Sequence, residues 1–141
     1  MWRLRYKVWL VCLPLLLSMK GPQERWTIEV LNAANSEGKI RIGVYKDAST
    51  FPNETKQFVG LVQEIKNGKS SFIVELPIGS SYAFAAYHDE NNNGILDKNL
   101  LGMPLERYGF SNDAREMFSS PEFSSAEVRS PPIDKLTITL Q

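Results

Sequence analysis

Residues 81–88 (SYAFAAYH) constrain the fold of this chain more than any other stretch. In an extended strand their side chains would alternate between two faces, and neither face is plainly polar. A sheet face that meets water carries polar residues. This strand is therefore predicted to lie inside a sheet that is covered on both sides.

Other short runs follow the same two-residue period and are separated by turn-forming residues. Together with 81–88, the predicted strands cover residues 26–30, 39–45, 57–66, 69–76, 123–128 and 135–140. Residues 113–118 could form one helical turn, and no long helix is expected. Six or seven short strands predict an all-β fold, an antiparallel β-sandwich of about seven strands similar to immunoglobulin-type domains.

Turn signals predict which strands pair. Asn67-Gly68 is a strong signal for a two-residue turn, so residues 57–66 and 69–76 are predicted to form a hairpin. Residues 32–38 are rich in turn formers. The strands at 26–30 and 39–45 are therefore predicted to be adjacent and antiparallel.

The first 20 residues differ from the rest in composition. Three basic residues precede an apolar run at 8–17, which is typical of a secretory signal peptide and too short to span a bilayer. We expect residues 1–20 to be a signal peptide, residues 21–141 to form one domain, and the protein to be periplasmic or extracellular. An uncleaved N-terminal anchor is the alternative. Cys12 is the only cysteine and lies in this run, so the expected mature domain has no disulfide and no thiol nucleophile.

Charge excludes two classes of partner. The whole chain has 16 basic and 16 acidic residues, but Arg3, Arg5, Lys7 and Lys20 lie in the first 20 residues, which hold no acidic residue. The remaining domain has 12 basic and 16 acidic residues, a net charge near −4. We therefore expect no binding to nucleic acid and no membrane contact beyond the signal segment.

A polar loop follows the strand at 81–88. Counting from Asp89, oxygen-bearing side chains stand at positions 1, 3, 5 and 9, glycine stands at position 6, and position 7 could offer its backbone carbonyl. This spacing matches the first three-quarters of an EF-hand-type calcium loop, in which alternate side chains turn towards the ion. The predicted ligands are Asp89, Asn91, Asn93, Ile95 and Asp97, with the sharp turn at Gly94.

The match to a calcium loop is incomplete. Position 12 is Leu100 instead of the usual Glu, and a strand leads into the loop. Asn99 or Glu106 could complete the ligand shell. The glycines and proline of residues 102–112 would fold that segment back and bring Glu106 or Asn112 near the loop; an ordinary long connection is the alternative. With two carboxylates, calcium affinity should be weak, on the order of 10⁻⁴ to 10⁻³ M. Oxygen ligands select against soft transition metals. A metal-free turn capped by its own Asn and Asp side chains is the alternative.

Three blocks of sequence carry a family resemblance. PIGSSYAFAAYHDENNNGILD (77–97), GMPLERYGFSN (102–112) and PEFSSA (121–126) together resemble the secreted bacterial domain-of-unknown-function family 2141. The resemblance runs from about Trp26 to the C-terminus and implies a secreted or periplasmic protein without assigned activity. More distantly, the turn and polar loop are similar to transthyretin-like and B-type repeat domains of surface proteins. Their seven-stranded sandwiches agree with the predicted fold.

The favoured function is a calcium-stabilised structural or binding module of the cell envelope. The sequence does not identify its partner; an envelope protein and a glycan are the candidates. A second class is a carbohydrate- or peptide-binding domain that uses Trp26, Tyr45 or Tyr87 as an exposed platform.

A hydrolase is the third class, with His88 acting alongside Asp89 and Ser111. His88 is the only histidine, and no strand–turn–helix motif presents a nucleophile. Enzymatic activity is therefore not expected.

Overall fold

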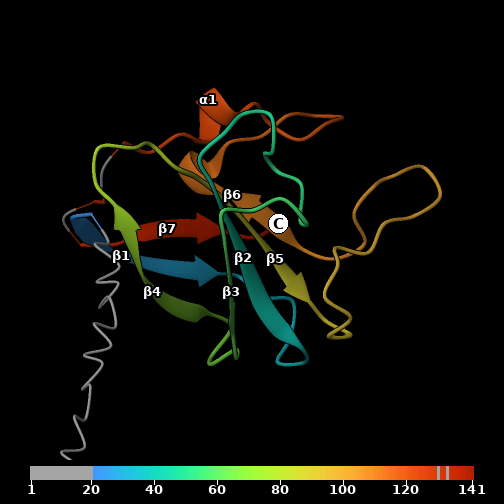
Figure 1. The fold of residues 1–141 in the computed structure, drawn as a ribbon. Coiled ribbons are helices and arrows are strands. Elements are labelled where there is room, and N and C mark those ends of the chain that lie inside the picture. Colours follow the sequence, from blue (N-terminus) through green and yellow to red (C-terminus); the bar gives the residue numbers. More distant parts are fainter. Residues whose placement is uncertain (1–20, 130, 133) are drawn as a thin grey trace, which may run out of the picture.

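The computed structural model describes residues 21–129, 131–132 and 134–141, so the predicted signal peptide lies outside the described residues. In this part of the chain, seven strands form two sheets that pack face to face (Figure 1). The strands are β1 (Gln23–Leu31), β2 (Lys39–Tyr45), β3 (Val59–Gln63), β4 (Ser70–Pro77), β5 (Ala83–Asp89), β6 (Tyr108–Phe110) and β7 (Leu136–Thr139). The predicted β-sandwich is confirmed.

The four-stranded sheet has the order β3-β2-β5-β6, and all its neighbours are antiparallel. β5 lies between β2 and β6, with Ala86 opposite both Ile42 and Gly109. Phe84 and Ala86 face the core between the sheets, whereas Ala83 on the outer face packs against residues of the C-terminal connection. The predicted central, doubly covered position of this strand is confirmed.

The three-stranded sheet has the order β4-β1-β7. β1 is antiparallel to β4, with Trp26 opposite Val74, but parallel to β7, with Val30 opposite Ile138. The expectation of a wholly antiparallel sandwich is therefore wrong for this sheet. β7 follows a long connection from β6 in the other sheet, and a connection of that length lets a strand enter beside β1 in the same direction.

Two predicted strand pairings are wrong, although the strands exist. β1 and β2 belong to different sheets, and so do β3 and β4. At Asn67-Gly68 the two-residue turn does form, with positive φ angles and a single bridge between Lys66 and Lys69. The chain then continues across the sandwich instead of along a hairpin. The two-residue period predicts which side of a strand is buried, but it does not predict which sheet the strand joins.

The C-terminal third differs most from expectation. Residues 123–128, predicted as a strand, contain the short helix α1 (Phe123–Ala126), whose Ala126 is buried against Ala83 and Phe110. The helical turn predicted at 113–118 is wrong, because a 3₁₀ turn, η1 (Ser111–Asp113), precedes that position. The predicted closing strand at 135–140 is confirmed as β7. Among the described residues, no helix is long and apolar enough to cross a membrane.

The main core lies between the sheets and contains the inward side chains of most strands. Trp26 of β1 packs against Tyr82 edge to face, with 5.7 Å between ring centroids, and against Phe84 at 5.2 Å. Contacts of this kind stabilise a core beyond the apolar area they bury. Its other buried members are Ile28, Val30, Ile40, Ile42, Val44, Phe72, Leu76, Ala86, Leu136, Ile138 and Leu140.

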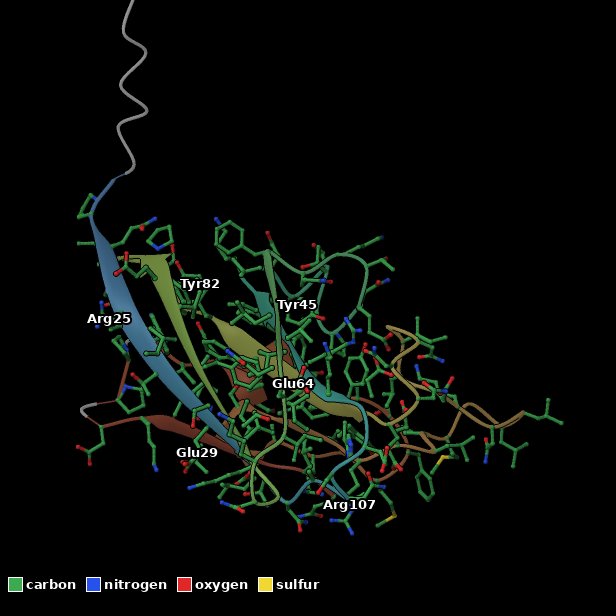
Figure 2. The ribbon with its side chains drawn as sticks, turned by 90° about the horizontal axis from the view of Figure 1, so that it is seen from below. Arg25, Glu29, Tyr45, Glu64, Tyr82 and Arg107 are labelled. Carbon is green, nitrogen blue, oxygen red and sulfur yellow. The ribbon has the colours of Figure 1, made fainter. Side chains whose placement is uncertain are left out.

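An ion-pair cluster joins the strands on the outer face of the three-stranded sheet. Glu29 lies in the C-terminal half of β1 (Figure 2). Its two carboxylate oxygens accept hydrogen bonds from Lys69 (3.1 Å) and Lys135 (2.7 Å). Lys69 precedes β4 and Lys135 precedes β7, so one carboxylate holds both neighbours of β1. Hydrogen bonds from Lys135 and then Lys69 lower the pKa of Glu29.

The Glu29→Gln variant tests this cluster, because it keeps the shape of the side chain and removes the charge. A carboxylate whose pKa is lowered by folding stabilises the fold above its ordinary pKa of about 4.3, and this contribution is lost as the pH falls through the folded-state value. We expect Glu29→Gln to melt below the wild type at pH 7 and the difference to shrink below about pH 4.3. Thermal unfolding from pH 7 to pH 3 measures this.

Glu75→Gln is the matched control for Glu29→Gln. Glu75 pairs with Arg25 at 3.7 Å, and both side chains are more than half exposed (68% and 58%). An exposed pair of this kind contributes little. If the two variants lost the same stability over the same pH range, Glu29 would not hold the sheet as described.

Candidate metal centre

The polar loop begins at a buried carboxylate. Asp89, the last residue of β5, is fully buried, and its Oδ1 accepts a hydrogen bond from the backbone N–H of Asn93 at 3.0 Å. Its Oδ2 accepts from the backbone N–H of Gly94 at 2.9 Å and from Arg41 Nε at 2.5 Å. Arg41 lies on the neighbouring strand β2. Asp89 therefore fixes the curl of the loop and neutralises a cation from the sheet.

Alternate Asn side chains hold the next turn of the loop. Asn91 Oδ1 accepts from the N–H of Asn93 at 3.2 Å, and Asn93 Oδ1 accepts from the N–H of Ile95 at 3.1 Å. Gly94 has a φ of +85°, a backbone conformation that favours glycine. The two-residue spacing in the sequence is thus used for side chains that hydrogen-bond the backbone two residues ahead.

Three polar side chains of the loop come together around Asp97. Its carboxylate accepts from Asn91 Nδ2 at 2.7 Å and from Asn93 Nδ2 at 3.0 and 3.1 Å. The fourth predicted side-chain ligand, Asp89, is directed towards Arg41 and the loop backbone. The orientation of each Asn amide is assigned from this hydrogen-bond network. The carboxylate of Asp97 and the side-chain amides of Asn91 and Asn93 therefore meet at one point of the loop. The carboxylate of Asp89 is bonded instead to Arg41 and the loop backbone.

The two additional ligand candidates have different positions. Glu106 is buried and bridges both ends of the loop, accepting from the N–H of Glu90 at 2.9 Å and from the N–H of Asp97 at 3.0 Å. Asn99 Oδ1 caps its own turn by accepting from the N–H groups of Leu101 and Met103. The predicted return of residues 102–112 to the loop is thus confirmed through Glu106.

Asn112, the other candidate for this return, lies elsewhere. Its Nδ2 donates to the carbonyls of Ser125 and Glu127, beside α1. Asn112 has a φ of +58°, so this residue forms a left-handed turn that fastens the C-terminal connection. It does not approach the loop through these contacts.

Three residues that support the loop have no clear signal in the sequence. Arg41 pairs with Asp89, the Tyr87 hydroxyl donates to the carbonyl of Gly94 at 2.9 Å, and Glu54 accepts from the N–H of Leu96 at 3.0 Å. Burial, and then the nearby charge of Glu54, raise the pKa of Tyr87, so its hydroxyl stays protonated as a donor. The alternating pattern of β2 places Arg41 on the outer face, but nothing in the sequence indicates its partner.

The donor set limits the chemistry of the centre. Among residues 21–129, 131–132 and 134–141, no three His, Cys, Asp or Glu side chains are grouped so that they could hold a metal ion. A cation in the loop would depend on amide and backbone carbonyl oxygens for much of its shell. Such neutral oxygen ligands suit a hard ion and give weak affinity.

The positions of His88 and Ser111 exclude the predicted hydrolase site. His88 is fully buried; its Nδ1 accepts from the N–H of Ala34 at 3.1 Å and its Nε2 donates to the carbonyl of Glu37 at 2.6 Å. Ser111 is bonded instead to the N–H of Phe84 at 3.0 Å. Phe84 and His88 are four residues apart on one strand, about 13 Å. His88 therefore fixes residues 34–37, and it does not form a catalytic triad with Ser111.

The prediction that Trp26, Tyr45 or Tyr87 forms an exposed aromatic platform is wrong for two of these three residues. Trp26 is fully buried in the core, and Tyr45 is buried with its hydroxyl donating to the carbonyl of Asn53 at 3.1 Å (Figure 2). Burial raises the pKa of Tyr45 to about 12. Tyr87 is half-buried on the outer face of the four-stranded sheet. No flat row of solvent-facing aromatics is formed by these residues.

The Arg41→Met variant tests the support of the loop. Methionine keeps the apolar stem of the side chain but leaves the buried Asp89 carboxylate without its cation. We expect a loss of roughly 3 kcal/mol in the free energy of unfolding, because an uncompensated charge is costly to bury. Urea unfolding at pH 7 measures it.

Lys39→Met, on the same strand, is the control for Arg41→Met. Lys39 pairs with Glu64 at 3.1 Å; Lys39 is half-buried and Glu64 is exposed, so no charge would be left buried and the expected loss is below about 1 kcal/mol. Equal losses in the two variants would show that burial of Asp89 does not set the stability of the loop.

One family matches this chain. The family described as "Uncharacterized protein conserved in bacteria (DUF2141)" matches residues 28–134, which include the strands β2 to β6 and the whole polar loop. Comparisons with curated proteins and with solved structures give no match. The family resemblance carried by the three sequence blocks is confirmed. The chain belongs to DUF2141, an uncharacterised bacterial family.

Proposed function

We propose that this β-sandwich is an exported module of the bacterial cell envelope, with a structural or binding role, and that calcium stabilises its polar loop. The observation that carries the proposal is the arrangement of Asn91 and Asn93 around the carboxylate of Asp97, at 2.7–3.1 Å. All three side chains carry oxygen atoms, which are hard ligands. The loop that holds them is fixed by Asp89 and lies at one end of the sandwich.

Loop preorganisation supports this proposal. The backbone of residues 89–97 is already curled by the bonds to Asp89 and Glu106. A cation would therefore not have to order the chain in order to bind. Asp97 carries the negative charge of the group, and the amide oxygens of Asn91 and Asn93 each have a second lone pair available.

A metal-free loop is the competing interpretation. The Asn side chains already cap backbone N–H groups, and Arg41 supplies a positive charge next to Asp89. Under that interpretation the same residues would stabilise a turn without any ion. The response of stability to calcium separates the two interpretations.

Calcium addition and removal provide the main test. A ligand that binds only the folded state at 100 times its dissociation constant stabilises by about 2.7 kcal/mol. We expect the melting temperature of residues 21–141 to rise between excess chelator and about 50 mM calcium, which is near 100 times a dissociation constant in the weak range for extracellular modules. Magnesium, which prefers to keep its water shell, should raise it less.

Asp97→Asn shows whether the rise comes from the loop. It keeps one of the two oxygens that accept from Asn91 and Asn93 and removes the charge, so the variant should fold in chelator and lose most of the calcium-dependent rise. Asp47→Asn, in an exposed stretch before β3, should keep the full rise. An identical melting temperature in calcium and chelator for the wild type would contradict the proposal.

Export is tested separately from calcium. The basic and apolar N-terminal segment predicts that a full-length chain with a C-terminal tag accumulates in the periplasm, shortened by roughly 20 residues. Leu15→Arg places a charge within the apolar run and should leave the chain uncleaved in the cytoplasm. Mass spectrometry of the fractionated protein measures both. A full-length cytoplasmic product from the unaltered chain would contradict export.

A further inference from the structure

A pocket of about 220 Å³ lies over the outer face of the four-stranded sheet. Its floor is formed by three neighbouring strands at Gly60 of β3, Gly43 of β2 and Ala85 of β5, where Gly43 is opposite both Gly60 and Ala85. These residues have no side chain or a single methyl group. A Cβ at Gly43 would lie 2.7–2.9 Å from atoms of the Tyr45 side chain, which also lines the pocket, so glycine here makes room for that ring. At Gly60 and Ala85 the absence of a large side chain leaves the space above the sheet open.

Aromatic rings form one fixed wall of the pocket. Tyr87 of β5 is opposite Tyr108 of β6 in the sheet register, and both line the space together with Phe110. The Tyr87 hydroxyl is bonded to Gly94, and the ring of Tyr108 packs against Phe110 edge to face at 5.8 Å. Held in this way, the rings offer a surface that needs little ordering when a ligand binds.

Two loops supply an apolar rim that is largely exposed to solvent. Met103 comes from the connection between β5 and β6, and Met117 and Phe118 come from the connection that follows β6. Figure 1 shows both connections projecting beyond the strands. Met117 is 80% exposed and Phe118 is 86% exposed, although both line the pocket. Covering such side chains with an apolar ligand removes unfavourable apolar surface from water.

We propose that this pocket binds a small aromatic molecule, a single or fused ring that carries a polar substituent. A cavity of about 150 Å³ accommodates benzene, so 220 Å³ leaves room for a larger ring system. Aromatic walls and methionine sulfur both favour aromatic over aliphatic ligands. This site goes beyond the proposed calcium-binding site; residues of the polar loop line part of it, but it requires no bound calcium.

The pocket also has unused polar groups for a substituent. Gln57, Lys98 and Glu116 line it, and their side chains have no hydrogen-bond or ion-pair partner among the described residues. In contrast, Arg41 and Glu54, which also line it, are engaged by the polar loop. A hydroxyl, amine or ring N–H on the ligand would therefore find a partner at the pocket rim.

Methionine-methyl NMR provides a direct test. The chain has four methionines, and Met103 and Met117 are the two in the described residues. A ring bound in the pocket lies beside their methyl groups and shifts the resonances upfield. With indole as the probe, we expect saturable shifts of both resonances and a dissociation constant of about 1 mM or below. Cyclohexanol, an aliphatic probe, should bind at least tenfold more weakly.

Gly60→Leu should block the pocket and leave the fold intact. The three atoms nearest to a Cβ at this position on the edge strand β3 all belong to the exposed side chain of Gln57, the closest being Nε2 at 2.9 Å. We expect at least tenfold weaker indole binding and an unchanged or higher melting temperature. Ser71→Leu, an exposed position on the other sheet, is the control for adding a leucine and should keep indole binding.

Phe118→Ser and Leu100→Ser form a second matched pair. Phe118 lines the pocket, whereas Leu100 is fully exposed and does not. Only Phe118→Ser should weaken indole binding, by about threefold or more.

Absence of saturable shifts up to 10 mM indole, equal binding of cyclohexanol, a response only to aromatic peptides, or full binding by Gly60→Leu would each overturn the proposal. All of these readouts are independent of the calcium-dependent melting temperature.

Discussion

The contact between Asp89 and Arg41 organises the functional half of this sandwich. A fully buried carboxylate at the end of the central strand needs partners for both of its oxygens, and it finds them in one guanidinium and two backbone N–H groups. The guanidinium ties the loop to β2, and the N–H groups set its curl. Gly38 lies so close to the backbone carbonyl of Asp89 that no Cβ could fit there, so the crossing from β1 to β2 depends on the same point. The ion pair and the two N–H bonds fix the conformation at the start of the loop without any bound ion.

The two faces of β5 contribute to different parts of the structure. Residues that face inward join the main core, and residues that face outward form the pocket floor, one aromatic wall and the start of the polar loop. Loops therefore cover the outer face of the sheet but leave an open space above it. Gly60, Gly43 and Ala85 on three neighbouring strands add no large side chain to the space beneath the covering connections, and that space is the pocket.

Much of the fold could be predicted from the two-residue period, including the central position of β5 and the closing strand β7. Sheet membership could not, because the pattern of β1 and β2 is equally satisfied by strands that are neighbours or that face each other across the core. Helix α1 was missed since Phe123 and Ala126 fit the spacing of one helical turn as well as a weak strand. In the candidate site, the curl at Asp89 and the return of Glu106 follow from local spacing and turn chemistry. Arg41, Glu54 and the pocket depend on contacts between distant segments, which no local pattern records.

β1 and its parallel neighbour β7 run in the same direction, towards one end of the sandwich. β1 begins beside Ile78 and runs about 26 Å to the end where Asn32 meets Arg107 and where His88 holds residues 34–37. The polar loop emerges at that far end. Any chain that precedes residue 21 is therefore attached at the pole opposite to the loop. On a surface-tethered molecule, the polar loop would therefore point into the surrounding medium.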